Sequence, residues 1–152
     1  MKIIIAVDPG ASGGISWNDI TGTRISSIPM PDTEGDIVAF FTMLALCRPT
    51  LVIEQVGGFA GKGQPGSAMF NFGMGFGFIK GVAQALKIPV ILVRPQQWQK
   101  DLSLGNKKSY EKQWKNHLKE RAQQLFPHSP VTLKTADSLL IYHWAIKFGK
   151  IL

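Results

Sequence analysis

Apolar residues come in short runs separated by polar turn residues, and the first part of the chain has the pattern of strands. Residues 3–7 form a continuous β-favouring run that ends at Asp8 and a Pro-Gly turn, which is typical of a strand buried on both faces. Residues 15–17 and 23–28, joined by a tight Thr-Gly turn, predict two further strands. The three runs together predict an antiparallel meander.

The rest of the pattern alternates helical spacing with short apolar runs. Helices are predicted at residues 37–44, 67–86, 107–126 and about 134–148, with a short helix opening at Pro95, and strands at residues 51–53 and 89–93. This order predicts an α/β fold with a mixed five-stranded sheet, three antiparallel strands plus two parallel ones, flanked by helices. No repeat, low-complexity tract or linker interrupts the pattern, so a single domain over residues 1–152 is expected.

Composition and charge narrow the class of partner. Apolar residues make up 45% and charged residues 18% of the 152 residues, which is ordinary globular usage and argues against disorder. Lys and Arg number 17 against 10 Asp and Glu, a net charge of +7. Such an excess is expected where the partner is a polyanion, either nucleic acid or an acidic membrane surface.

Cysteine usage and the N-terminal run bear on the compartment. Cys47 is the only cysteine, which excludes an intrachain disulfide and favours a reducing compartment, and we expect its thiol to be packed among its apolar neighbours. The apolar N-terminal run is far shorter than the roughly 18 residues that span a membrane. A cytoplasmic protein without a membrane anchor is therefore expected.

Three carboxylates stand where predicted elements begin or end. Asp8 follows the first strand, Glu54 follows the strand at residues 51–53, and Asp137 comes early in the last helix, on the same face as apolar residues at helical spacing. A carboxylate on a packed helix face is costly unless it is ion-paired, hydrogen-bonded or bound to a metal. Each position alone is also common in purely structural turns and helix starts, so the argument depends on the three together.

Convergence of these three side chains would create a site for a hard divalent cation. Mg²⁺ prefers oxygen ligands in octahedral geometry and retains waters. Two such ions can activate a water and stabilise the leaving oxygen during phosphodiester hydrolysis. We therefore predict a nuclease centre made of Asp8, Glu54 and Asp137, with two Mg²⁺ ions.

At these positions the sequence resembles the RuvC family of Holliday-junction resolvases, and it looks closest to the small phage-type members. The matching segments span most of the chain: residues 5–10 (IAVDPG), 52–56 (VIEQV), 67–73 and 81–82 in the glycine-rich stretch, and 136–139 (ADSL). Their order and spacing argue against a chance match.

The resemblance implies an RNase H-like fold and a homodimer that grips a four-way DNA junction and makes paired nicks with Mg²⁺ or Mn²⁺. By family position, Asp8, Glu54 and Asp137 correspond to metal-binding catalytic acids. The family usually has a fourth metal-site residue, Asp or sometimes His, one helical turn before the last acid. This chain has Lys134 there, which cannot ligate an ion while protonated. Lys134 could contact the scissile phosphate instead, a fourth ligand could come from elsewhere, or cleavage could be weakened. A phage-encoded member would act in the cytoplasm of its host.

A basic stretch and a glycine-rich stretch are the candidate DNA-contacting surfaces. The lysines assigned to DNA binding are Lys62, Lys107, Lys108, Lys112, Lys115 and Lys134. Lysines also recur in the helix after residue 106 so that several could share one helical face and follow phosphates, namely Lys107, Lys108, Lys112, Lys115 and Lys119. Charge runs also commonly just face water. Phe59, in the glycine-rich loop, is the candidate wedge that stacks on a base at an opened junction. The glycine-rich helix after it is a candidate dimer seam.

Three other functions stay open at the level of sequence. Another RNase H-like nuclease, acting on flaps or RNA–DNA hybrids, would use the same acids. A nucleotide-binding domain of the actin and sugar-kinase type can also open with a strand that ends in Asp and a glycine turn, but it needs a second phosphate loop and a longer chain. A junction-binding protein with a decayed nuclease site would account for Lys134.

Overall fold

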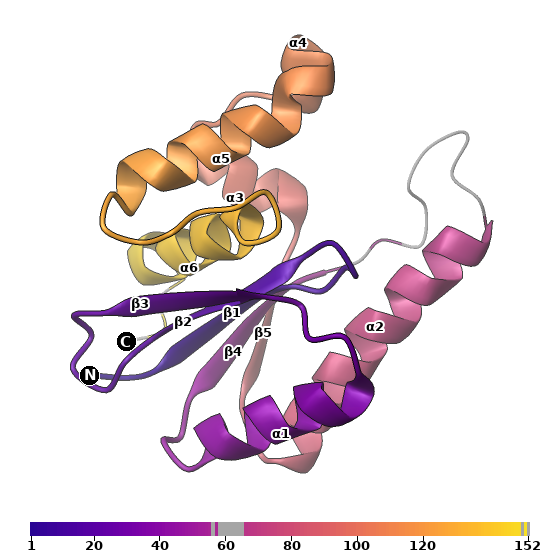
Figure 1. Cartoon of the computed structure of the whole chain (residues 1–152), viewed down its shortest axis with the longest axis vertical. Coiled ribbons are helices and arrows are strands. Elements are labelled where there is room, and N and C mark those ends of the chain that lie inside the picture. Colours follow the sequence, from indigo (N-terminus) through magenta and orange to yellow (C-terminus); the bar gives the residue numbers. More distant parts are fainter. Residues whose placement is uncertain (56, 58–65, 150, 152) are drawn as a thin grey trace.

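A five-stranded sheet in the order β3-β2-β1-β4-β5 runs through the middle of the molecule (Figure 1). The computed structural model describes residues 1–55, 57, 66–149 and 151. The strands are β1 (Ile4–Asp8), β2 (Gly14–Asn18), β3 (Ile25–Pro29), β4 (Thr50–Glu54) and β5 (Val90–Val93). β1, β2 and β3 pair antiparallel, whereas β4 pairs parallel with both β1 and β5, as the sequence pattern predicted.

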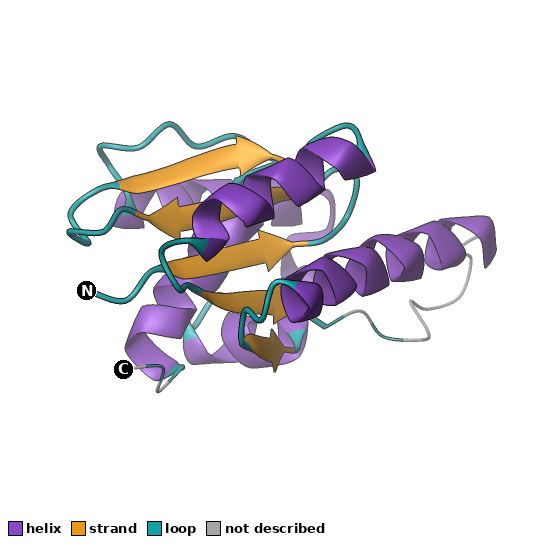
Figure 2. Cartoon of the chain, turned by 90° about the horizontal axis from the view of Figure 1, so that it is seen from below, coloured by secondary structure: helices purple, strands orange, loops and turns teal. Residues whose placement is uncertain are grey.

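Helices cover both faces of this sheet (Figure 2). They are α1 (Glu34–Ala45), α2 (Gly66–Ala85), α3 (Pro95–Asp101), α4 (Lys107–Tyr110), the 3-10 helix η1 (Glu111–Gln113), α5 (Trp114–Leu125) and α6 (Ala136–Phe148). α1 and α2 pack on one face, and α6, accompanied by α3 and α5, packs on the other. The bounds of α2 and α6 agree with the predicted helices to within about two residues.

The alternation of side chains along β1 supplies the core on both sides of the sheet. Ile4 and Ala6 face the α6 side, whereas Ile5 and Val7 face α1 and α2. All four are at most 2% exposed, which explains why the strand is a continuous apolar run rather than an alternating one. At the N-terminal end of β1, Asn18 Oδ1 accepts the Ile4 N–H at 2.8 Å.

The single helix predicted over residues 107–126 is wrong in one respect, because the structure interrupts it. Glu111 has a φ of 49°, a left-handed value that takes the backbone out of the α-helix and separates α4 from η1 and α5. Asn106 caps the N-terminus of the short α4, because its Oδ1 accepts the Ser109 N–H at 2.9 Å. The lysines of this stretch therefore lie on a bent arm instead of one helical face.

The expectation for Cys47 is also wrong, because its side chain is exposed. The buried positions of α1 are Ile37, Phe41 and Leu44, and the helix ends before residue 47. The Cys47 N–H then closes the turn onto the Leu44 carbonyl at 3.0 Å, which leaves the thiol facing solvent.

Across the residues that the structure describes, no helix is long and apolar enough to cross a membrane.

Candidate nuclease site

The central strands bring two of the predicted acids to the same edge of the sheet. The parallel register of β1 and β4 pairs Val7 with Ile53, so the next residues, Asp8 and Glu54, end neighbouring strands. Side chains at matching positions of adjacent strands point to the same face. Asp8 is only 9% exposed and Glu54 is partly buried, so both carboxyls are largely withdrawn from water.

Two glycines clear the space around Asp8. A Cβ on Gly13 would collide with the Asp8 backbone and would lie 2.9 Å from Asp8 Cγ. A Cβ on Gly14 would lie 2.6 Å from the Lys134 carbonyl oxygen. Gly13 therefore lets β2 begin beside Asp8, and Gly14 lets the segment that leads into α6 pass close to the sheet at this edge.

α6 delivers the third acid to the same place. Asp137 lies in the first turn of this helix and is 8% exposed. The next residue, Ser138, fixes the helix to the sheet, because its Oγ shares a buried 2.7 Å hydrogen bond with Ser16 Oγ of β2. Ser138 Oγ also donates to the Thr135 carbonyl at 3.0 Å. These contacts set the height and rotation of α6 and thereby aim Asp137 at the ends of β1 and β4.

The charges of neighbouring acids help to raise the pKa values of Asp8 and Glu54. The pKa of Asp8 is raised to about 7, mainly by burial and then by the charge of Asp137, against the opposing charge of Lys115. The pKa of Glu54 is raised to about 8, again mainly by burial and then by the charges of Asp8 and Asp137. The pKa of Asp137 is raised by burial, although Lys115 opposes this. The three side chains therefore form one electrostatic cluster, which we call the acid cluster.

Lys115, at the start of α5, is the cation of this cluster. Its Nζ lies 3.3 Å from Asp137 Oδ2, and this is the one ion pair within the described part of the chain. Burial alone would lower the pKa of Lys115, but the charges of Asp137, Asp8 and Glu54 raise it. One ammonium thus faces three carboxyl groups, so the site has an excess of negative charge once Asp8 and Glu54 are ionised, above about pH 8.

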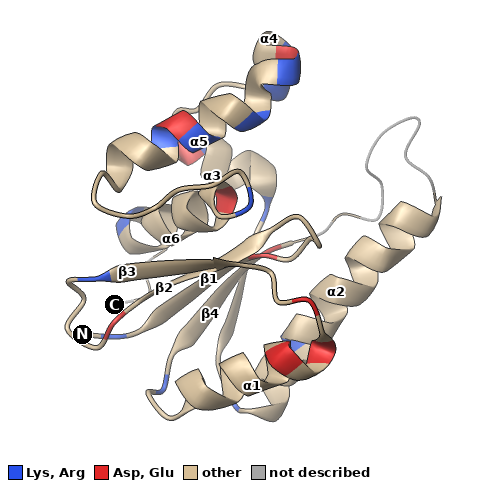
Figure 3. Ribbon diagram, viewed as in Figure 1, with Lys and Arg blue, Asp and Glu red and all other residues tan. Residues whose placement is uncertain are grey.

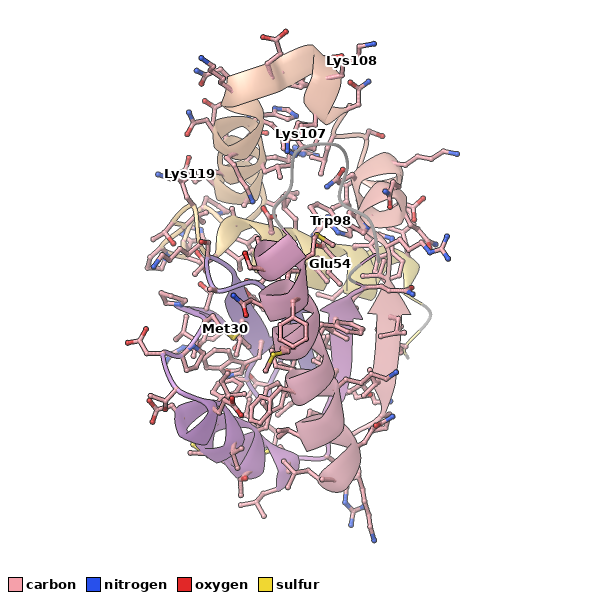
Figure 4. The ribbon with its side chains drawn as sticks, turned by 90° about the vertical axis from the view of Figure 1, so that its right-hand side faces the viewer. Met30, Glu54, Trp98, Lys107, Lys108 and Lys119 are labelled. Carbon is pink, nitrogen blue, oxygen red and sulfur yellow. The ribbon has the colours of Figure 1, made fainter. Side chains whose placement is uncertain are left out.

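Two tryptophans hold the site from the α3 side, and the sequence pattern did not identify either of them. The fully buried Trp98 donates from Nε1 to Glu54 Oε2 at 2.8 Å, and Figure 4 shows the two side chains together. Trp144 of α6 donates from Nε1 to Asp101 Oδ2 at 2.7 Å, which ties α6 to α3. A buried tryptophan needs an acceptor for its N–H, and this requirement was the one available signal that pointed to Trp98.

The donor set suits a hard cation, although the side chains as they stand are not arranged to share one. Among the residues described, no three His, Cys, Asp or Glu side chains form a group that could bind a metal ion in their present positions. Two of the acids have other partners, because Glu54 is held by Trp98 and Asp137 by Lys115. Carboxylate oxygens with uncompensated charge are nevertheless the ligands that Mg²⁺ prefers. A shared metal ion at the acid cluster therefore stays a prediction.

Six of the 17 Lys and Arg residues lie on the arm formed by α4, η1 and α5 (Figure 3). Lys107, Lys108 and Lys112 are exposed there, and Lys134 is exposed just before α6. Lys62 and the wedge candidate Phe59 lie outside the described residues. Within the arm, the ring of Tyr110 stacks on His117 at 3.9 Å between centroids, and His117 Nε2 donates to the Leu104 carbonyl at 2.7 Å.

α2 presents a surface with little charge on the other side of the molecule. Phe70 is 68% and Met74 is 54% exposed, and Lys80 is the helix's sole charged residue. Added Cβ atoms on Gly73, Gly77 and Gly81, spaced one turn apart, would meet nothing within 4 Å. The N-terminal half of the helix extends beyond the sheet (Figures 1 and 2). This apolar, glycine-rich face is open to a partner.

The fold is that of RuvC. The Thermus thermophilus RuvC structure matches with a TM-score of 0.62 and 16% sequence identity, covering 97% of this chain and 96% of that chain. T. thermophilus RuvC in complex with a Holliday junction substrate matches with a TM-score of 0.63 and 15% identity, covering 99% and 98%. No protein-family model matches the sequence, and no curated protein matches it significantly. The predicted RNase H-like fold is thereby confirmed.

Proposed function

We propose that this protein is a metal-dependent endodeoxyribonuclease that resolves Holliday junctions and other branched DNA by paired nicks. The observation that carries the proposal is the acid cluster, in which three distant segments bring carboxyl groups with raised pKa values to one edge of the sheet. The basic arm beside it offers phosphate contacts. The RuvC of the same fold has been described with a Holliday junction substrate, which favours branched DNA over other nucleic acids.

Asp8, Glu54 and Asp137 are the residues that would hold Mg²⁺, or Mn²⁺ in its place. Two such ions, when bound, activate a water and stabilise the leaving oxygen of the phosphodiester. Trp98 keeps one oxygen of Glu54 engaged and so restricts the rotation of that carboxylate. The Ser16–Ser138 hydrogen bond keeps Asp137 in register with the strand ends. These contacts would make the site rigid on the side that faces away from DNA.

A homodimer is part of the proposal, with α2 as its seam. Glycines one turn apart let a second helix come close, and exposed Phe70 and Met74 would be withdrawn from water on association. A two-fold dimer of this kind would present two sites to a junction that itself has two-fold symmetry, which suits paired incisions.

The direct test is Mg²⁺-dependent cleavage of four synthetic substrates: a four-way junction, a flap, an RNA–DNA hybrid and a linear duplex. We expect symmetric nicks in the four-way junction and little cleavage of the linear duplex. A preference for the hybrid or the flap would replace our substrate with that of another RNase H-like nuclease.

Substitution of the acids tests the catalytic assignment. Asp8→Asn, Glu54→Gln and Asp137→Asn should each reduce junction cleavage by at least about a thousandfold while junction binding stays within a few-fold, because each removes a metal ligand and leaves the basic arm intact. Cleavage rates and binding by electrophoretic mobility shift measure the two effects. Full activity in any of the three would remove that residue from the site.

A second candidate function is a junction-binding protein with weakened cleavage. The observation that favours it is Lys134, exposed at the position where the resembled family usually has a fourth metal-site residue, Asp or sometimes His. Such a protein would bind four-way junctions tightly and leave them uncut at any Mg²⁺ or Mn²⁺ concentration. Lys134→Asp, assayed beside the parent, distinguishes the two functions, because an added ligand would increase cleavage by a weakened site.

A further inference from the structure

Lys115 stands where a cation is needed and reaches the acid cluster from outside. Its ammonium is 3.3 Å from Asp137 Oδ2, and its charge acts on the pKa of Asp8, Glu54 and Asp137 alike. No other side chain on the described segments forms an ion pair with these acids. In the metal-free protein, therefore, one lysine does the neutralising that a divalent cation would do more completely.

The two partners of this ion pair differ in how firmly they are held. The side chain of Asp137 is 12% exposed, whereas that of Lys115 is 62% exposed. Asp137 is fixed through its neighbour Ser138, but the lysine stem is long, flexible and largely in water. An ion pair with one exposed partner is weak and is easily exchanged for another partner. Lys115 can leave the site without disturbing the core.

We propose that Lys115 is an exchangeable counter-ion that occupies the cation position of the metal-free acid cluster and is displaced from Asp137 when a divalent cation binds. This inference rests on the proposed function in that it assigns the acid cluster to metal binding. It gives Lys115 a role that differs from the phosphate contacts proposed for the other lysines of the arm. Lys107, Lys108 and Lys112 lie farther along that arm and make no ion pair among the residues described.

The consequence is a competition between Lys115 and the metal. A divalent ion that enters the cluster is repelled by the nearby Lys115 ammonium and has to displace that ammonium from Asp137. Lys115 therefore weakens metal binding. Removal of the lysine charge should therefore strengthen metal binding by roughly tenfold at low ionic strength. Because the repulsion is partly screened, the gain should shrink as salt is added. A lysine that merely fastened α5 to α6 would not affect metal affinity in this way.

The experiment measures Mn²⁺ binding to the intact protein without DNA, by loss of the free Mn²⁺ electron paramagnetic resonance signal. Lys115→Gln is compared with Lys119→Gln, which removes the same charge one helical turn farther along α5. Lys115→Arg keeps the charge, and Lys115→Met keeps the stem if the glutamine variant folds poorly. A pH of about 8.5 lies above the pKa of about 7 for Asp8 and of about 8 for Glu54, so these carboxyls are mostly ionised in the parent.

We expect Lys115→Gln and Lys115→Met to bind Mn²⁺ roughly tenfold more tightly than the parent in low salt, with a smaller gain in high salt. Lys119→Gln and Lys115→Arg should stay within about threefold of the parent. Unchanged or weaker binding in the two Lys115 neutral variants would overturn the inference, as would an equal gain in Lys119→Gln.

Failure of this inference differs from failure of the proposed function. If the parent binds Mn²⁺ and cuts junctions but Lys115→Gln binds no more tightly, the inference alone is wrong. If Lys115→Gln binds more tightly but no variant cuts branched DNA, the counter-ion role stands and the nuclease proposal is wrong. A parent that binds no Mn²⁺ at the acid cluster would overturn both.

Discussion

Asp8 is buried and Glu54 is partly buried, and the fold opposes the ionisation of both. Their pKa values in the folded protein, about 7 for Asp8 and about 8 for Glu54, lie above the ordinary values near 4. Between about pH 4 and pH 8, these two groups therefore bind more protons in the folded protein than in the unfolded chain. The contribution of these two acids to the free energy of unfolding of the metal-free protein therefore decreases as pH rises from about 4 to about 8. His143 acts in the opposite sense, because burial lowers its pKa. A comparison of variants is needed to isolate the acids.

Asp8→Asn removes one of these charges and should stabilise the metal-free protein at high pH. We expect a gain of about 1–3 kcal/mol at about pH 8.5 in EDTA, and a smaller gain or none at about pH 5, where the parent carboxyl is protonated. Thermal unfolding across this pH range measures the effect. Asp32→Asn, at an exposed loop position, removes the same charge as a control. If the free energy of unfolding of the parent rose from pH 5 to pH 8.5 by as much as that of Asp8→Asn, the Asp8 charge would not be destabilising and this prediction would be wrong.

The positions of the acids could be predicted from sequence, but the residues that hold them could not. Asp8 and Glu54 end apolar runs, and a strand boundary is a local signal. Trp98 and Ser138 act through contacts with segments 44 and 122 residues away, and no local pattern reports such contacts. Lys115 was predicted to contact DNA, while its ion pair with Asp137 depends on how α5 lies on α6.

The same limit applies to the secondary-structure elements. The strands were predictable because burial on both faces leaves a continuous apolar run, as in β1. The break between α4 and α5 was not, because Glu111 is an ordinary helix former that adopts a left-handed backbone. Tertiary contacts overrule the local preference there. The stacked Tyr110 and His117 fasten α4 back onto α5.

This bent arm should provide most of the phosphate contacts. Joint replacement of Lys107, Lys108 and Lys112 by Gln should weaken binding to junctions and to duplex DNA alike, by at least about tenfold, because phosphate contacts carry no sequence information. The slope of log affinity against log salt should become shallower by about 0.9 for each phosphate that the variant no longer neutralises. Fluorescence anisotropy at several salt concentrations measures both quantities.

A matched control is available away from the arm. Lys2, Arg48 and Lys87 gather around a cavity of about 430 Å³ that is otherwise lined mainly by Leu, Ile, Ala and Pro side chains. Their joint replacement by Gln removes the same net charge without touching α4 or α5. If this control lowered DNA affinity and the salt slope as much as the arm variant did, total charge rather than the arm would account for binding.

At the scale of the whole molecule, the uncharged face of α2 is the feature that a monomer does not explain. A solvent-facing helix with a single lysine in 20 residues, and with Phe70 and Met74 exposed, leaves apolar surface in water. We expect the 16.7 kDa chain to sediment as a dimer, and Phe70→Glu with Met74→Glu to sediment as a monomer, because the added charges would be buried at the seam.

Separation of the subunits should leave nicking of junctions intact but make the two nicks independent of each other. Each acid cluster lies within one chain, so the monomeric variant should still nick DNA, but the two nicks should become independent and the yield of linear duplex products should fall by at least about tenfold. Leu46→Glu, at an 86% exposed apolar position outside α2, serves as the control and should stay dimeric. Analytical ultracentrifugation and a cruciform-plasmid assay, which separates nicked from linear products, measure the two effects. A dimer that survives both glutamates would move the seam away from α2.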